Sequence, residues 1–255
     1  MDTQHDKVIG AVMVVGGGIG GIQSSLDLAD AGYKVYLVEA SPTIGGVMAQ
    51  LDKTFPTNDC SMCILSPKLV ECGRHLNIDI MTCAQVQGIS GEPGAFRVQV
   101  VQQPRYIDAQ ACTGCGVCAR LCPARAIDVF NEGLNQRAAI YIRYPQAVPL
   151  AYTIDRQQCI GCGLCQNVCL ANAVRYDDAK KEVELQVGAL ILAPGFEEFD
   201  AHLRGEYGYG RFPNVVTSIE FERILSASGP FKGRVQRPSD GDIPTKVAFI
   251  QCVGS

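Results

Sequence analysis

The sequence lacks any apolar run that approaches the about 18 residues needed to span a bilayer. Its first residues, MDTQHDKVIG, lack the basic and apolar regions of a secretory signal peptide. The sequence also has no excess of positive charge, because it contains 22 Lys and Arg and 26 Asp and Glu, which give a net charge of −4. We therefore expect a cytoplasmic protein with no membrane span and no nucleic-acid partner.

Histidine is scarce, with three isolated residues, and none is proposed as a catalyst. Cysteine and glycine are abundant, at 13 and 27 of 255 residues. An odd number of cysteines does not suit a disulfide framework, and the density is high for a cytosolic chain, which favours metal or redox chemistry. The length and the hydrophobic content of 47% predict a sizeable core in one to two domains.

The opening segment predicts a β-α-β unit. An apolar strand is expected over 11–15, a helix from about Gly20, and a second strand over 35–38. The string VVGGGIGG joins the first strand to the helix. This is the context in which a glycine loop binds a dinucleotide, whereas an isolated glycine triplet also turns strands into helices without binding anything.

Three glycines of this loop stand in GxGxxG register. Gly16 permits the tight turn, Gly18 lets the backbone approach a pyrophosphate, and Gly21 lets helix and strand pack closely. The helix N-terminus supplies N–H groups for the phosphates. Glu39 ends the second strand, where a carboxylate accepts hydrogen bonds from ribose hydroxyls and repels a 2′-phosphate, which argues against NADP.

These residues alone do not decide between FAD and NAD. Gly45-Gly46 and the turn LILAPG, which ends at Gly195, resemble the second glycine pair and the strand–Ala-x-Gly turn of glutathione-reductase-like flavoproteins. Pro194 departs from the Thr that is commoner in that turn. The resemblance favours FAD, and the candidate contacts are Gly16, Gly18, Gly20, Gly21, Glu39, Ala40, Gly45, Gly46, Ala193 and Gly195.

Eight cysteines form an internal repeat with an offset of 47 residues, CTGCGVCARLCPARAI at 112–127 and CIGCGLCQNVCLANAV at 159–174. Cys-x2-Cys-x2-Cys-x3-Cys is the run of bacterial ferredoxins, in which the fourth cysteine serves the other cluster. Zinc knuckles, the alternative, use paired CxxC hooks without a third and fourth cysteine. We expect one [4Fe–4S] cluster on Cys112, Cys115, Cys118 and Cys169, and another on Cys159, Cys162, Cys165 and Cys122.

Four further cysteines lie outside the repeat and precede it. Cys60 and Cys63 form a CxxC, and Cys72 and Cys83 follow. A redox dithiol or an additional cluster is one interpretation, since a CxxC lowers a thiol pKa. Small buried apolar residues beside a flavin are the other, and both stay open.

The remaining elements complete one α/β domain with an insertion. Strands are expected over 77–82, 96–101, 182–187 and 189–192. A helix is expected over 218–227, because Thr217-Ser-Ile-Glu220 has the spacing of a capping box, and a final buried strand over 247–250. The predicted segments are a flavin-binding part over 1–104, a ferredoxin-like insert over 105–176, a return to the flavin-binding part over 177–204, and a connection to a second nucleotide-binding-like half over 205–255.

Several strings are more specific than the glycine loop, among them FPTNDCSMCILSPK, YPQAVPLAYTID and KVAFIQCVGS. Together with the glycine loop and the cysteine repeat, they resemble the A-type subunits of heterodisulfide reductase. The resemblance implies an FAD-binding, thioredoxin-reductase-like Rossmann core with an inserted two-cluster ferredoxin module. It also implies partner subunits and a ferredoxin or hydrogenase-type donor or acceptor in anaerobic metabolism.

Family members continue past this C-terminus, so the chain resembles an N-terminal fragment. Cys252 matches a ligand of a further cluster whose other ligands lie downstream, and is expected to be an orphan thiol. Two functional classes follow, a flavin and iron–sulfur redox subunit or a non-catalytic electron relay. A third is a protein similar to the small subunit of glutamate synthase, although its clusters precede the flavin domain.

Overall fold

The computed structural model describes residues 8–254, which form two compact units. The first unit comprises residues 8–49, 63–126 and 138–195. The second comprises residues 50–62, 127–137 and 196–254. No helix among the described residues is long and apolar enough to cross a membrane.

A four-stranded parallel sheet lies in the first unit, with the strand order β13-β1-β2-β5. Met13 and Val14, in the interior strand β1, are fully buried, as expected for a parallel strand covered on both faces. The last strand in the chain pairs with β1, so one sheet is built from both sides of the cysteine repeat. The strands are β1 (Ala11–Val15), β2 (Lys34–Glu39), β5 (Ile78–Thr82) and β13 (Ala189–Leu192).

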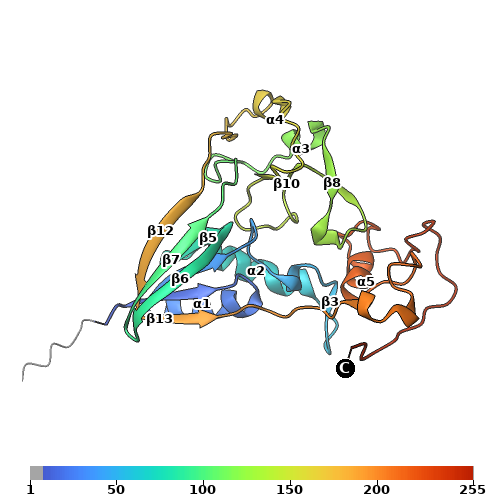
Figure 1. The fold of residues 1–255 in the computed structure, drawn as a ribbon, viewed down its shortest axis with the longest axis horizontal. Helices are drawn as coiled ribbons and strands as arrows, with labels where there is room; N and C mark the ends of the chain where they lie inside the picture. Colours follow the sequence, from blue (N-terminus) through green and yellow to red (C-terminus); the bar gives the residue numbers. More distant parts are fainter. Residues whose placement is uncertain (1–7, 255) are drawn as a thin grey trace, which may run out of the picture. The chain divides into compact units, whose positions relative to one another are not determined.

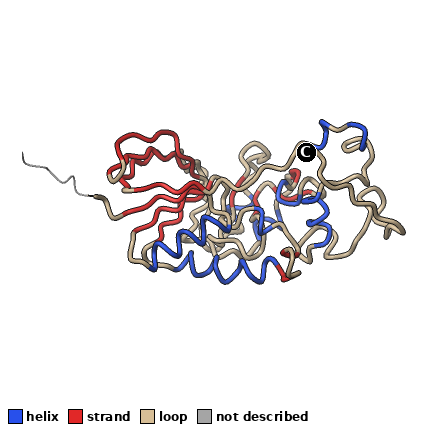
Figure 2. The backbone as a smooth tube through the Cα atoms, turned by 90° about the horizontal axis from the view of Figure 1, so that it is seen from below, coloured by secondary structure: helices blue, strands red, loops and turns tan. Residues whose placement is uncertain are grey.

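Two helices accompany this sheet. The predicted helix α1 (Ile19–Asp30) follows Gly18 and contacts β1, β2 and β5. Helix α2 (Ser61–Arg74), which we did not predict, lies beside α1 (Figure 2), and Lys68 of α2 donates a hydrogen bond to the Gln23 side chain of α1. The two helices therefore form one layer.

A three-stranded antiparallel sheet, in the order β12-β7-β6, is the second sheet of this unit. It comprises β6 (Ala84–Glu92), β7 (Ala95–Gln102) and β12 (Lys181–Val187). Met13 and Val38 of the parallel sheet share a buried cluster with Val98, Val100 and Val187 of the antiparallel one. Strand β6 was not predicted, because its sequence AQVQGISGE has few apolar residues and a bulge near Gly88.

The two cysteine runs carry short helices that lie side by side, α3 (Val117–Leu121) and α4 (Leu164–Asn167) (Figure 1). Ile107 forms an isolated bridge with Val174, so the start and the end of the repeat meet. Between the two cysteine runs the chain forms β8 (Arg125–Ile127), a 3-10 turn at Val129–Asn131, β9 (Gln136–Ala138), β10 (Ile140–Tyr141) and β11 (Thr153–Ile154), of which residues 127–137 belong to the second unit.

Helix α5 (Ser218–Leu225) belongs to the second unit and ends two residues before the predicted limit. The predicted capping box is present, because the Thr217 hydroxyl accepts from the Glu220 N–H and the Glu220 carboxylate accepts from the Thr217 N–H. Fully buried Arg223 donates from Nε to the Asn131 side chain and from Nη1 to the Gln50 carbonyl. One side chain thus joins three chain segments of this unit.

The remaining second-unit elements are β3 (Lys53–Thr54), β4 (Asp59–Cys60) and 3-10 turns at Ala201–Leu203 and Gly205–Tyr207. The predicted strand over 247–250 was wrong, because the structure has no strand there. Val247, Phe249 and Ile250 are 52%, 73% and 58% exposed. Apolar composition makes a strand only where a neighbouring strand supplies N–H and C=O partners, and the described residues supply none.

Candidate functional site

At Gly16 and Gly21 the glycine loop leaves no room for a side chain. Gly16 has a φ of +108°, and a Cβ there would lie 2.1 Å from the Ala193 carbonyl oxygen. A Cβ at Gly21 would lie 1.8 Å from the Gly16 carbonyl oxygen. The structure therefore brings the loop against the helix start and against the chain that leaves β13, as the GxGxxG spacing predicts.

The second glycine pair lies against the first loop. Gly46 has a φ of +57°, and a Cβ there would lie 2.8 Å from the Gly18 Cα. The Gly45 N–H donates to the Gly17 carbonyl at 2.7 Å. The structure therefore brings residues of the first loop, the second glycine pair and the β13 turn together at the carboxyl ends of parallel strands, where open α/β sheets bind ligands.

Glu39 is held at the end of β2 by two backbone groups. Its carboxylate oxygens accept from the N–H groups of Gly17 and Ser41, each at 2.7 Å. These bonds orient the half-buried carboxylate beside the start of α1. The other candidate contacts, Gly20 on the first turn of α1, Ala40 after Glu39 and Gly195 after β13, are exposed.

The segment between the two cysteine runs contacts the loop that carries the second glycine pair. Val148 accepts hydrogen bonds through its carbonyl from Ile44 N–H at 2.9 Å and from the Thr43 hydroxyl at 2.8 Å. The Tyr144 hydroxyl donates to the Ile44 carbonyl. Burial raises the pKa of Tyr144 to about 12, so this donor keeps its proton. The repeat is thereby attached to the predicted flavin site.

Buried Arg105 strengthens this attachment. Its guanidinium donates to the Thr82 hydroxyl at 2.7 Å and to the Pro42 carbonyl, beside the parallel sheet. It also donates to the carbonyl of Ala151 at 3.2 Å, in the inter-repeat segment. The sequence reasoning missed Arg105 and Tyr144. The available signals were the string YPQAVPLAYTID, which begins with Tyr144, and the place of Arg105 at the start of the predicted insert.

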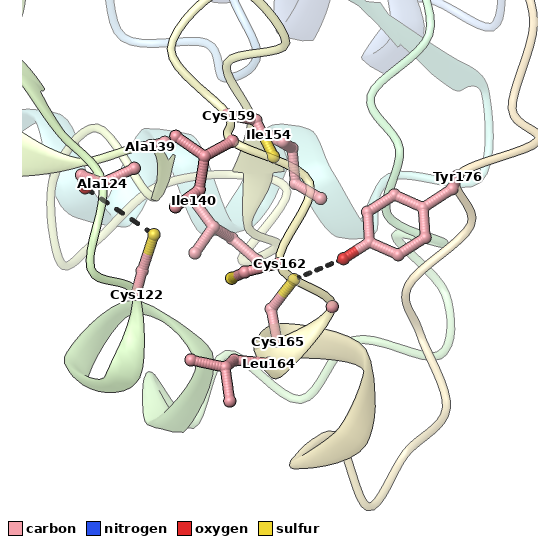
Figure 3. A pocket seen from close by; sticks show the side chains of 12 residues that line it. Cys122, Ala124, Ala139, Ile140, Ile154, Cys159, Cys162, Leu164, Cys165 and Tyr176 are labelled. Carbon is pink, nitrogen blue, oxygen red and sulfur yellow. Dashed lines mark hydrogen bonds between the residues drawn. The ribbon is translucent and has the colours of Figure 1, made fainter.

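One cavity collects cysteines from both runs (Figure 3). Cys122 of the first run lines it together with Cys159, Cys162 and Cys165 of the second. The adjacent Gly163 has a φ of +74°, and nothing lies within 4 Å of where its Cβ would stand. The four cysteines predicted to bind the second cluster therefore line one cavity. Three of them belong to the second run, and the fourth, Cys122, belongs to the first.

Two contacts involve the sulfurs of the second run. The Tyr176 hydroxyl lies 2.9 Å from Cys165 Sγ (Figure 3), and the Ala173 N–H donates to Cys169 Sγ at 3.3 Å. Burial, followed by the hydrogen bond with Cys165, raises the pKa of Tyr176. A protonated hydroxyl is therefore available to this cysteine.

Tyr152 lies beside the first run, with its hydroxyl near Gly116. Burial, followed by the charges of nearby Cys118, Cys112 and Cys115, raises the pKa of this tyrosine. Cys112, Cys118 and Cys169 pack against one hydrophobic cluster, which also contains Cys122, Cys159 and Cys165. A hydrogen bond with the Val117 backbone lowers the pKa of the exposed Cys115 thiol, which favours a thiolate.

Among the described residues, no three His, Cys, Asp or Glu side chains lie close enough together to hold a single metal ion. A four-iron cluster has a different requirement, because its thiolates bind separate irons.

The other cysteines differ in environment. Cys60 and Cys63 are disulfide-bonded, and Cys63 is exposed, so this pair is not a pair of small buried apolar residues. Cys72 is fully buried in α2, and burial raises its pKa to about 12, which suits an inert core residue. Burial also raises the pKa of half-buried Cys83, and Cys252 is exposed.

Residues 11–65 match the family of FAD dependent oxidoreductases, and residues 111–173 match the 4Fe-4S dicluster domain family. These matches confirm the predicted combination of a flavin-binding α/β fold with a ferredoxin-like module. Among solved structures, the flavoprotein disulfide reductase RclA from Escherichia coli is 15% identical over 83% of this chain and 26% of its own, with a TM-score of 0.29. That score is too low to add to the fold described above.

Similarity to curated proteins extends over the whole chain. An A-type iron-sulfur subunit of the CoB--CoM heterodisulfide reductase of Methanopyrus kandleri is 54% identical over 99% of this chain and 38% of its own length. The A-type subunit of the H(2):CoB-CoM heterodisulfide,ferredoxin reductase of Methanothermobacter marburgensis is 52% identical over 100% of this chain and 39% of its own. The chain therefore spans about two fifths of the length of these relatives, and the resemblance drawn from its sequence is confirmed.

Proposed function

Because this chain is homologous throughout to part of the A-type subunits of heterodisulfide reductase, we propose that it is a flavin and iron–sulfur redox subunit. In this proposal it passes electrons between a donor, FAD and two [4Fe–4S] clusters inside a heterodisulfide-reductase-like complex. One observation carries the proposal. Cysteines of two separate runs line one cavity, within the same compact unit as the glycine loop.

The flavin half of the proposal assigns a task to each part of the loop. Gly16 makes the tight turn, Gly18 would let the backbone approach the pyrophosphate, and the N–H groups at the start of α1 would bind the phosphates. The Glu39 carboxylate, held by two backbone N–H groups, accepts from the ribose hydroxyls. Bound FAD supplies two-electron exchange with a donor and one-electron exchange with the clusters.

The cluster half assigns the eight repeat cysteines to two crossed sets. The shared cavity supports the set of Cys122 with the first three cysteines of the second run. For the other set, Cys112, Cys115, Cys118 and Cys169, the proposal rests on the repeat, because one hydrophobic cluster holds cysteines of both sets. The protein tunes such clusters through burial and hydrogen bonds to sulfur, for which the Ala173 N–H that donates to Cys169 is one example.

Electron transfer between the two cofactor sites needs a fixed separation. Val148 and Tyr144 fasten the inter-repeat segment to the loop that ends at the second glycine pair, and Arg105 fastens the same segment beside β5. The three contacts stiffen the connection between the flavin loop and the cysteine runs. We assign them this positioning role.

The names of the relatives support a proposal for the partners. Among the names of the relatives, one includes H2 and ferredoxin, and another states dependence on ferredoxin or F420H2. For this chain we propose a cytoplasmic complex with other heterodisulfide-reductase-like subunits and a ferredoxin or hydrogenase-type protein as donor or acceptor. The order of the two family matches, flavin before clusters, disfavours the glutamate-synthase alternative, in which the clusters come first.

Anaerobic reconstitution tests the proposal. We expect about eight irons and eight acid-labile sulfides per chain, from two clusters of four each, with one FAD. Stoichiometric zinc without labile sulfide would contradict it. Reduction of the flavin by hydrogen with hydrogenase, or by reduced ferredoxin, identifies a redox subunit, whereas a flavin that exchanges electrons only with the clusters identifies a relay.

A further inference from the structure

The hydroxyl of Tyr176 contacts one predicted cluster ligand. It lies 2.9 Å from Cys165 Sγ, at the edge of the cavity lined by Cys122, Cys159 and Cys162 (Figure 3). A cysteine that binds iron is a thiolate, which accepts hydrogen bonds and donates none. With Cys165 as a ligand, Tyr176 is therefore the donor of this bond.

The repeat does not reproduce this contact in its first half. The offset of 47 residues places Val129 at the position that corresponds to Tyr176, and valine has no donor. The tyrosine beside the first run is Tyr152, which comes from a different position in the repeat. Its hydroxyl faces Gly116 and has no hydrogen bond to a cysteine sulfur among the described residues.

The first run has a hydroxyl of its own, but in a different environment. Thr113 lies two residues before Cys115, which is exposed, so water competes for this sulfur. Cys165 is buried, and a hydrogen bond to charge is stronger where the local dielectric is low. Of these two hydroxyls, that of Tyr176 should therefore have the larger effect on the reduction potential of a cluster.

We propose that Tyr176 is a positioning residue whose hydrogen bond to Cys165 raises the reduction potential of the second cluster. Reduction adds one electron and one negative charge to the cluster and its thiolates. A hydrogen-bond donor stabilises the more negative state more strongly, so the reduced cluster gains more than the oxidised one. This inference rests on the second cluster of the proposed function.

The test is an EPR-monitored redox titration of the reconstituted chain with Tyr176→Phe, and with Tyr152→Phe as the matched control. We expect Tyr176→Phe to lower the reduced-to-oxidised ratio of the second cluster about tenfold at a fixed potential, which is 59 mV for a one-electron couple. The first cluster keeps its potential, and Tyr152→Phe leaves the second cluster unchanged. Unchanged potentials in Tyr176→Phe, with both clusters present, would overturn the inference.

A second variant covers the case in which Tyr176→Phe does not retain its cluster. Site-specific fluorination of the Tyr176 ring makes the hydroxyl a stronger donor without removing it, and we expect the potential of the second cluster to rise. A role in packing alone predicts no such rise, so an unchanged or lower potential would overturn the inference. Failure of the proposed function shows separately, as missing iron and sulfide in the unmodified chain.

Discussion

Cys122 lines the same cavity as Cys159, although 36 residues separate them and only three separate Cys122 from Cys118. Crossed ligation therefore predicts that Cys122→Ala perturbs the same cluster as Cys159→Ala. The reduced-state EPR spectra of the two variants measure this, because loss of a thiolate converts the cluster to a three-iron form or abolishes its signal.

Neighbours in the sequence provide the control for this prediction. Cys118→Ala should resemble Cys112→Ala, and Cys169→Ala should do the same. A Cys122→Ala spectrum that matches Cys112→Ala instead would mean that each run closes its own site, and the ferredoxin interpretation of residues 105–176 would have to be withdrawn.

The parts of this molecule that could be predicted are those encoded by short patterns. A strand, a glycine loop and a helix occupy adjacent residues, as do four cysteines on one run. Helix α2 was predictable too, since Leu65, Leu69 and Cys72 recur at helical spacing, but our interpretation of this segment considered only its cysteines. Its absence from our predictions was an error of interpretation.

Other features depend on residues that are distant in sequence, and no local pattern contains them. The partners of Arg105 lie as far away as Pro42, and Tyr144 contacts Ile44 across 100 residues. The false strand over 247–250 has the same cause, because its apolar residues met no pairing partner. The hydrophobic periodicity of a segment indicates which secondary structures it can adopt. The segments packed against it in the fold determine which of them it adopts.

The second prediction concerns the adenosine end of FAD. Glu39→Ala removes the acceptor for the ribose and also the group that holds the N–H groups of Gly17 and Ser41. Hydrogen bonds to a charged group contribute about 1.5–3 kcal/mol each, so we expect FAD to bind about tenfold more weakly or worse. Flavin and iron analyses of the purified variant measure this, and the iron content should not change.

Glu184→Ala, an exposed carboxylate on β12, is the control for loss of charge alone and should keep its flavin. Equal flavin retention in Glu39→Ala and Glu184→Ala would mean that the nucleotide lies elsewhere.

The third prediction compares two glycines of the same loop and helix. Gly16→Ala forces a side chain into a left-handed backbone and against the Ala193 carbonyl, so we expect a loss of about 3 kcal/mol or more. Gly20 lies in α1 with nothing within 4 Å of its Cβ position, and Gly20→Ala should gain about 0.5–1 kcal/mol. Urea unfolding followed by far-UV circular dichroism, at matched cofactor content, measures both. Similar effects of the two substitutions would contradict the close approach of Gly16 to the β13 turn.

The fourth prediction concerns the second compact unit, where Arg223 is fully buried and donates to the Asn131 side chain and the Gln50 carbonyl. Arg223→Met keeps much of the side-chain volume but leaves both acceptors without this donor. Each unmet buried acceptor costs about 1–3 kcal/mol, so we expect a destabilisation of about 3 kcal/mol.

The control is Arg237→Met, which removes exposed ion pairs with Asp240 and Asp242 that contribute about 1 kcal/mol at most. Hydrogen exchange of peptides from α5, read by mass spectrometry, should accelerate in Arg223→Met and stay unchanged in Arg237→Met, whereas equal exchange in the two variants would show that Arg223 does not hold these three segments together.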